Sequence, residues 1–290
     1  MIARDFKINS YLVDKLNSNE IIDSEQLKNQ FISLYNYNNE LTASLRYAEI
    51  IQKGALPKDR HFKRLFEDYF VMYVPQSFVS GDFYWIGEVD DKVLFAVGDC
   101  TGHGVPGAML TMLGQSFLNH IILGKGYTDT SKILVEFDKK FIETFRKEHT
   151  DKYSNDWIDI ALCCYDKIKG TLMFSSAKRK IMIMNNENML MYKGSNYPIG
   201  GWQMEAKRTF DAVTIKADAG DMVFLGSDGF QDQVGGDFSK KYGSKQLHNL
   251  LAEISYLPCE KQLMILKRTF LQWKRDEHQL DDVCLMGVRI

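Results

Sequence analysis

Residues 93–109 read VLFAVGDCTGHGVPGAM, and this stretch decides how the rest of the chain is organised. Five apolar residues precede Gly98 and Asp99, which is typical of a buried strand. The glycine-rich turn that follows lets the backbone approach a ligand or another segment closely. Carboxylate and main-chain carbonyl oxygens in such a turn suit hard divalent cations. We therefore expect Asp99 to lie at the end of a strand, beside a cation site on the rim of a sheet.

The same arrangement, an acidic residue at the end of an apolar run, occurs at three further places. Asp82 lies in VSGDFYW, Asp228 lies in SDGFQDQ, and Asp281 opens DDVCLMGVRI. A single Gly-Asp or Asp-Gly pair is common in turns and carries little weight. Four such carboxylates, spread over most of the chain, can converge only in a folded sheet structure. Their presence favours a two-metal centre.

These segments, in this order, resemble the SpoIIE-like branch of the metal-dependent protein phosphatases (the PPM family) over roughly residues 45–290. The resemblance implies an α+β fold, a sandwich of two antiparallel sheets flanked by helices (αββα). It also implies a protein serine/threonine phosphatase that uses two or three Mn²⁺ or Mg²⁺ ions. In that class a metal-bridged hydroxide attacks phosphoserine or phosphothreonine directly.

The resemblance also assigns roles to individual residues. Asp99 is expected to bridge the two metals, and the main-chain carbonyl of Cys100 to complete one of them. Asp228 and Asp281 are expected to hold the second metal. Asp82 is expected to bind the cluster directly or through its waters.

Several neighbouring residues have two interpretations. Asp282 should point to the opposite face of an extended strand from Asp281, which favours a supporting role over ligation. His103 is either a general acid or a residue that shapes the turn, and the turn role is favoured. Asp159 stands alone in an apolar strand and needs a buried partner. A phosphate needs a cation, although each basic run could equally be a solvated surface. The candidate phosphate ligands are Lys178, Arg179 and Lys240.

The resemblance implies a small phosphorylated protein as substrate, typically an anti-sigma-factor antagonist in a bacterial partner-switching system. A first alternative is a catalytically silent phosphatase-like docking module, which the presence of every expected ligand position disfavours. A second alternative is a metal phosphodiesterase that acts on a nucleotide or small molecule. Metal ligands alone do not separate it from a protein phosphatase.

Residues 27–52 carry seam positions spaced alternately four and three apart, which is a heptad pattern. Its members are Leu27, Phe31, Leu34, Asn38, Leu41, Leu45, Ala48 and Gln52. The pattern predicts a helix that ends near Leu56 and favours a coiled-coil homodimer. An amphipathic helix lying on its own domain is a nearly equal alternative. The expected organisation is an N-terminal helical regulatory or dimerisation segment, 1–56, and a phosphatase domain, 57–290.

The composition excludes several classes of protein. A net charge of −2 argues against a general nucleic-acid binder. The N-terminus lacks the apolar core of a signal peptide, and no stretch reaches the ~18 apolar residues of a membrane helix. The five cysteines contain no CxxC pair and predict reduced, mostly buried thiols. We therefore expect a cytoplasmic protein without a membrane span.

The remaining hydrophobic pattern predicts further elements in both halves of the chain. Residues 1–24 are expected to form a short helix or a cap, and a loop or short helix is expected near 61–69. Further helices are expected over 104–123, 131–149, 244–254 and 260–275. Strands are expected over 157–165, 171–175, 181–184, 189–192, 210–217 and 283–290, with a hairpin turn at 185–188 and a mobile polar loop at 235–243. Many short strands with two helix pairs fit an α+β sandwich better than βαβ alternation.

Overall fold

The computed structural model describes residues 24–145, 155–185, 188–201 and 208–290. The expectation for residues 1–23 and for the end of the helix predicted over 131–149 lies outside these residues. The chain divides into two compact units, Met1–Ile50 and Ile51–Ile290. No helix in the described ranges is long and apolar enough to cross a membrane.

The described part of the first unit is helical. Helix α2 spans Ser24–Ala55, so the predicted N-terminal helix is confirmed and its last residues belong to the second unit. No glycine or proline interrupts it before Gly54. Several large apolar side chains along it are exposed: Leu27, Phe31, Ile32, Leu34, Tyr35, Tyr37, Leu41, Tyr47 and Ile50.

Two antiparallel sheets form the second unit. The first sheet has the order β1 (Tyr69–Val74), β13 (Val283–Arg289), β10 (Met222–Gly226), β6 (Lys180–Asn185) and β7 (Asn188–Lys193). The second sheet has the order β2 (Asp82–Val89), β3 (Lys92–Cys100), β4 (Trp157–Asp166), β5 (Thr171–Ala177) and β9 (Val213–Lys216), and β8 (Ile199–Gly200) pairs with β4. The register of β6 with β7 confirms the predicted hairpin at 185–188.

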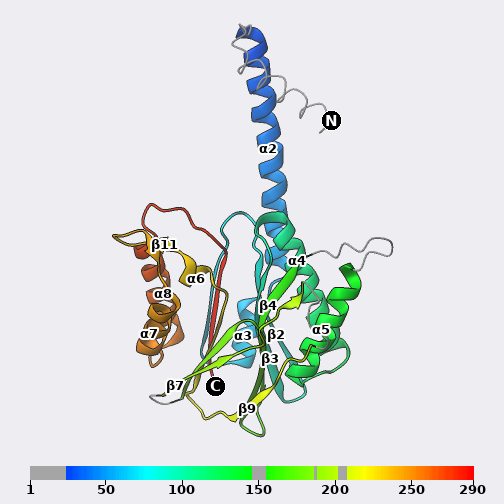
Figure 1. The fold of residues 1–290 in the computed structure, drawn as a ribbon, viewed down its shortest axis with the longest axis vertical. Helices are drawn as coiled ribbons and strands as arrows, with labels where there is room; N and C mark the ends of the chain where they lie inside the picture. The colour runs from blue at the N-terminus through cyan, green and yellow to red at the C-terminus, as the bar shows by residue number, and fades with distance from the viewer. Residues whose placement is uncertain (1–23, 146–154, 186–187, 202–207) are drawn as a thin grey trace. The chain divides into compact units, whose positions relative to one another are not determined.

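Helices cover the outer face of each sheet. They are α4 (Gly104–Leu118) with a π-helical extension η1 (Asn119–Gly124), α5 (Thr130–Phe145), α6 (Gly229–Asp232), α7 (Ser244–Ile254) and α8 (Cys259–Lys274). Helix α3 (Asp59–Leu65) instead packs Phe62 and Leu65 into the core between the two sheets. Within Ile51–Ile290, α4 and α5 lie on the outer side of the second sheet, and α7 and α8 lie beside the first sheet (Figure 1). The predicted αββα sandwich is confirmed.

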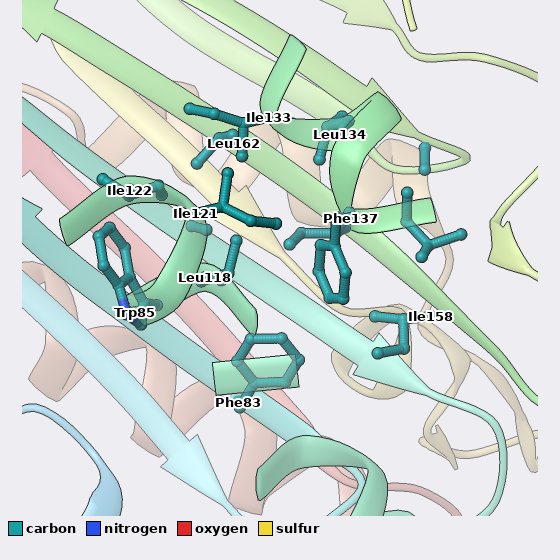
Figure 2. Packing of buried hydrophobic residues seen from close by; sticks show 14 of the residues in the cluster. Phe83, Trp85, Leu118, Ile121, Ile122, Ile133, Leu134, Phe137, Ile158 and Leu162 are labelled. Atoms are coloured by element: carbon teal, nitrogen blue, oxygen red, sulfur yellow. The ribbon is translucent and has the colours of Figure 1, made fainter. Parts of the chain in front are cut away.

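Strand β3 shows why the deciding stretch is continuously apolar. Successive side chains of a strand point to opposite faces, and in β3 both faces are buried. Val93, Phe95 and Val97 pack between the two sheets, whereas Leu94 and Ala96 face α4 and α5. Figure 2 shows the hydrophobic core between the second sheet and its helices. In it, helix residues such as Leu118, Ile121 and Phe137 contact strand residues such as Phe83, Trp85 and Leu162.

Two expectations about the C-terminal half need correction. The strand predicted over 210–217 begins only at Val213, because Phe210 is fully buried in the core below α5. The predicted loop at 235–243 instead contains a short hairpin, β11 (Val234–Gly235) paired with β12 (Lys240–Lys241). The prediction for the cysteines is confirmed, since all five are buried thiols.

Candidate metal centre and active site

Three carboxylates form a row across neighbouring strands of the second sheet. In the antiparallel register, Asp82 on β2 is opposite Asp99 on β3, and Asp99 is opposite Asp159 on β4. Residues directly opposite each other share a face of the sheet, with Cβ atoms about 5 Å apart. Three carboxyl groups are therefore held side by side at the end of this sheet.

The first sheet supplies two more carboxylates to the same place. Asp228 follows β10 and immediately precedes α6, and Asp281 precedes β13. Burial raises the pKa of Asp281, and the nearby charges of Asp228 and Asp282 raise it further, whereas His103 lowers it. The four carboxylates that the sequence singled out are thus brought together from both sheets, with Asp159 added to them.

Arg179 lies among these carboxylates. Its guanidinium nitrogens are 2.7 Å from Asp228 Oδ2, 3.3 Å from Asp159 Oδ2 and 3.4 Å from Asp99 Oδ2. Asp159 therefore has the buried partner that its place in an apolar strand requires. The sequence placed Arg179 only among candidate phosphate ligands. Its reach to the carboxylates depends on the β5–β6 turn, which no local pattern specifies.

Burial sets the protonation behaviour of the centre. Desolvation raises the pKa of Asp99 to about 8, Arg179 opposes this rise, and Asp228 and Asp159 add to it. Desolvation, followed by the charge of Asp99, holds the pKa of Asp82 well above its usual range. A buried carboxylate without sufficient positive charge nearby favours its neutral form. The cluster is therefore short of positive charge.

Hydrogen bonds from two segments, at Asp282 and at Cys100, fix the loop before β2. Asp282 accepts hydrogen bonds from the backbone N–H groups of Gln76 and Gly81, both at 2.7 Å, so it points away from Asp281 into a supporting position. The Cys100 N–H donates to the Gly81 carbonyl at 3.0 Å. These bonds join the ends of β2, β3 and β13 behind the carboxylates.

Gln52 is a buried contact that the sequence did not identify. Its side-chain amide donates to the Ser80 carbonyl at 2.7 Å and to Thr111 Oγ1 at 2.9 Å, and its Oε1 accepts from the Ser80 N–H at 3.0 Å. The heptad spacing placed Gln52 on the coiled-coil seam. That placement is wrong, because the side chain is 4% exposed and bonded inside the second unit. The sequence did contain one indication of this contact: Gln52 is a polar residue at the last position of a heptad pattern whose other members are mostly apolar.

The other candidate residues lie around the centre at different depths. His103 is exposed and immediately precedes α4. Lys178 is exposed with its ammonium 5.5 Å from the Trp157 ring centroid, and Lys240 is exposed with its ammonium 5.7 Å from the Phe238 ring centroid. The Cys100 side chain packs in the core.

The donor set fits hard divalent cations. Asp82 Oδ2 and Asp159 Oδ1 are buried oxygens without a hydrogen-bond partner, and an uncompensated buried charge is costly. Carboxylate oxygens are the ligands that Mg²⁺ and Mn²⁺ prefer. Among the described residues, no three His, Cys, Asp or Glu side chains stand close enough together to form a ready-made metal cluster.

A cavity of about 170 Å³ lies beside Asp228, between the β5–β6 turn, the end of β10 and α7. Its polar lining residues include Lys178, Arg179, Lys180, Ser227, Gln231 and His248. Burial, and then the nearby charge of Lys180, lowers the pKa of His248. The cavity therefore presents cationic and polar groups next to the carboxylate centre.

Comparison with known proteins defines the family. The family model for stage II sporulation protein E (SpoIIE) matches residues 89–290. The SiaA-PP2C domain of Pseudomonas aeruginosa is 29% identical with a TM-score of 0.78, over 88% of this chain and 98% of that one. The PP2C phosphatase domain of SpoIIE from Bacillus subtilis, with a regulatory-domain fragment, is 18% identical with a TM-score of 0.60, over 77% and 63%.

The RsbU and RsbW domains of Rv1364c from Mycobacterium tuberculosis give 18% identity and a TM-score of 0.60, over 77% of this chain and 59% of that one. None of the curated protein sequences matches this chain significantly. The fold is that of a PP2C-type domain, and the chain is a protein-serine/threonine phosphatase of this class. The chain belongs to the SpoIIE family.

Proposed function

We propose that the protein is a metal-dependent phosphatase that removes phosphate from phosphoserine or phosphothreonine of a signalling protein. The observation that carries this proposal is the convergence of Asp82, Asp99, Asp228 and Asp281 from both sheets on one edge of the sandwich. Two of the three carboxylates in the strand row keep a buried oxygen unpaired. Such a centre needs positive charge beyond a single guanidinium.

Divalent cations bound there would acidify a water for attack and neutralise charge on the phosphoryl oxygens. We assign Asp99, the Cys100 carbonyl, Asp228 and Asp281 to hold these cations, with Asp82 contributing directly or through water. Lys178 and Arg179 lie beside the centre and are the favoured ligands for the incoming phosphate, because their donors suit phosphoryl oxygens. Lys240 remains a candidate on the neighbouring hairpin.

His103 is a candidate proton donor to the leaving serine oxygen, and its proximity to Asp281 supports this assignment. Its place immediately before α4 supports the alternative, a residue that shapes the turn. A changed pH profile of hydrolysis in His103→Gln supports the first role. An unchanged profile supports the second.

The decisive experiment is hydrolysis of p-nitrophenyl phosphate and of a phosphoserine peptide with Mn²⁺, with Mg²⁺ and with EDTA. Asp99→Asn and Asp228→Asn should each lower turnover by about 100-fold or more, because each removes a proposed ligand. Asp218→Asn is the control, since Asp218 pairs with Lys216 at the surface. Metal-independent turnover would contradict the proposal. Folded protein that binds metal and phosphopeptide without turnover would favour the docking module.

The substrate we propose is a small phosphorylated protein of the anti-sigma-factor antagonist type, and we place this reaction in the cytoplasm. Support comes from the similarity to a chain that carries RsbU and RsbW domains, and to a structure described as part of the bacterial stressosome. The polar and cationic cavity beside Asp228 offers room for residues that flank the phosphate. Hydrolysis of cyclic nucleotides in preference to the phosphopeptide would favour the phosphodiesterase alternative.

We further propose that α2 pairs with a second copy of the chain. Phe31 is 70% exposed and Leu27 is 51% exposed, and both lie on the predicted seam. Phe31→Glu should then shift the mass in solution from dimer to monomer, as measured by light scattering. Asn29→Glu adds the same charge off the seam and should leave the dimer intact. A monomeric wild-type chain at high concentration would contradict this proposal.

A further inference from the structure

Arg179 is a buried cation whose contacts go beyond its proposed role as a phosphate ligand, because it pairs with the proposed metal ligands themselves. Its side chain is 12% exposed, and its guanidinium makes ion pairs with Asp99, Asp159 and Asp228 at once. The closest of these contacts, at 2.7 Å, reaches Asp228, which we assign to a metal ion. A positive group therefore already stands among the proposed ligands.

The backbone delivers the guanidinium to this place. Arg179 lies in the tight connection between β5 and β6, where Lys178 has a positive φ of 59°. The Arg179 N–H donates to the Ala177 carbonyl at 2.7 Å, and its own carbonyl accepts from Ser176 Oγ and from the Gly194 N–H. The main chain is thus fixed, while the long side chain retains several rotatable bonds.

The Arg179 guanidinium does not pair with every buried polar atom of the carboxylate centre. Arg179 Nε is buried without a hydrogen-bond partner, as are Asp82 Oδ2 and Asp159 Oδ1. One positive charge stabilises several carboxylates here, and more positive charge would stabilise them further.

We propose that Arg179 is a built-in counter-cation of the metal-free enzyme, which holds Asp99 and Asp228 and releases them when divalent cations bind. This inference rests on the metal site of the proposed function. Arg179 and the cations compete for the same carboxylate oxygens, so the arginine lowers the apparent metal affinity. Once released, its planar set of donors remains beside the centre, where the phosphate oxygens of a substrate arrive.

The test is calorimetric titration of Mn²⁺ into EDTA-stripped full-length protein at one pH, without substrate. Arg179→Gln should bind Mn²⁺ about tenfold more tightly or better, because charge-assisted hydrogen bonds no longer compete. The stripped variant should also melt at a lower temperature, because Asp99, Asp159 and Asp228 lose their counter-ion. Arg179→Lys keeps the charge without the planar fork and should lie between the two.

Lys180→Gln is the matched control, because it removes one positive charge from an exposed neighbour of Arg179. It should leave both the Mn²⁺ affinity and the melting temperature near the wild-type values. Circular dichroism of the Mn²⁺-loaded variants checks that each is folded.

Unchanged or weaker Mn²⁺ binding by folded Arg179→Gln would overturn the inference, as would an equal effect of Lys180→Gln. Absence of Mn²⁺ binding by all four proteins would overturn the metal site and this inference together. Tighter Mn²⁺ binding by Arg179→Gln without phosphate hydrolysis by the wild type would support this inference while overturning the proposed reaction. Failure of the Arg179 inference can therefore be distinguished from failure of the proposed phosphatase reaction.

Discussion

Three glycines meet where the first turn of α4 passes the loop before β2. A Cβ atom added to Gly107 would lie 2.9 Å from Gly81 Cα and would overlap the Gly102 carbonyl oxygen. A Cβ atom added to Gly81 would also overlap that oxygen and would lie 3.5 Å from Asp282 Oδ2. Gly81 and Gly107 need to be glycine because backbone atoms occupy the space of a side chain, whereas Gly102 has a positive φ of 80° that favours glycine.

Gly107→Ala should therefore displace α4 from the loop that carries Asp82. We expect the free energy of unfolding to fall by about 1–3 kcal/mol, the usual cost of overpacking, and metal-dependent hydrolysis to fall with it. Urea denaturation and a phosphatase assay measure the two effects.

Gly54→Ala provides the control for this substitution. Nothing lies within 4 Å of a Cβ atom added there, and the position is in α2. Alanine should stabilise this helical position by up to about 1 kcal/mol. Equal stability of Gly107→Ala and the wild type would show that the three-glycine contact tolerates a side chain.

Among the helices, α2 has a role in its last turns that differs from the rest of its length. Exposed apolar residues occur along the helix from Leu27 to Ile51, whereas Gln52 and the following Leu56 are buried in the second unit. Gln52 binds both the backbone of Ser80 and the side chain of Thr111 in α4. One side chain thus ties the loop before Asp82 to the helix that follows Asp99.

Gln52→Leu should break this tie and leave polar groups of Ser80 unpaired. Each buried unpaired group costs about 1–3 kcal/mol, so we expect the free energy of unfolding to drop by about 2–4 kcal/mol. Chemical denaturation measures this loss. Ala55→Leu introduces the same side chain at an exposed position of the same helix and should change stability little. Similar stabilities of the two variants would show that the Gln52 bonds contribute nothing.

The strands that carry the ligands were predictable from sequence for a physical reason. Strands β3, β10 and β13 are buried on both faces, so each appears as a continuous apolar run next to a carboxylate. Asp159 and Arg179 were harder to place. Their meeting depends on strand register and on the turn after β5, which are long-range properties.

The heptad pattern shows a related limit. The heptad spacing assigns Gln52 to the same helix face as the other seam residues. Its burial is determined instead by hydrogen bonds to Ser80 and Thr111, which are distant in the sequence. The strand predicted over 210–217 failed for the same kind of reason, since tertiary packing takes Phe210 into the core before β9 begins.

For the protein as a whole, the carboxylate centre links stability to both pH and metal. Burial raises the pKa of Asp99 to about 8 and raises the pKa values of Asp82, Asp159 and Asp281 above the ordinary range. The folded, metal-free protein therefore binds protons that the unfolded chain releases above about pH 4. Because the folded pKa values are raised, their contribution to stability is fully present below pH 4 and is lost as the pH rises toward 8.

We accordingly expect the EDTA-treated protein to become less stable between pH 6 and pH 8. The expected slope is about 1.4 kcal/mol per pH unit for each extra proton held by the folded state. Urea denaturation at pH 6, 7 and 8 measures this slope, and Asp99→Asn should reduce it because the amide does not titrate. A metal-free protein that is more stable at pH 8 than at pH 6 would contradict the raised pKa values.

Manganese should reverse this trend, because a divalent cation binds the deprotonated carboxylates and competes with their protons. At a free Mn²⁺ concentration 100 times the Kd, binding adds about 2.7 kcal/mol to the free energy of unfolding. Since the Kd should fall as the pH rises toward 8, the stabilisation by a fixed Mn²⁺ concentration should be larger at pH 8 than at pH 6. The same denaturation series repeated with Mn²⁺ measures this difference. An equal Mn²⁺ effect at both pH values would mean that no proton leaves the carboxylates when the metal binds, and that Asp82, Asp99 and Asp281 are not its ligands.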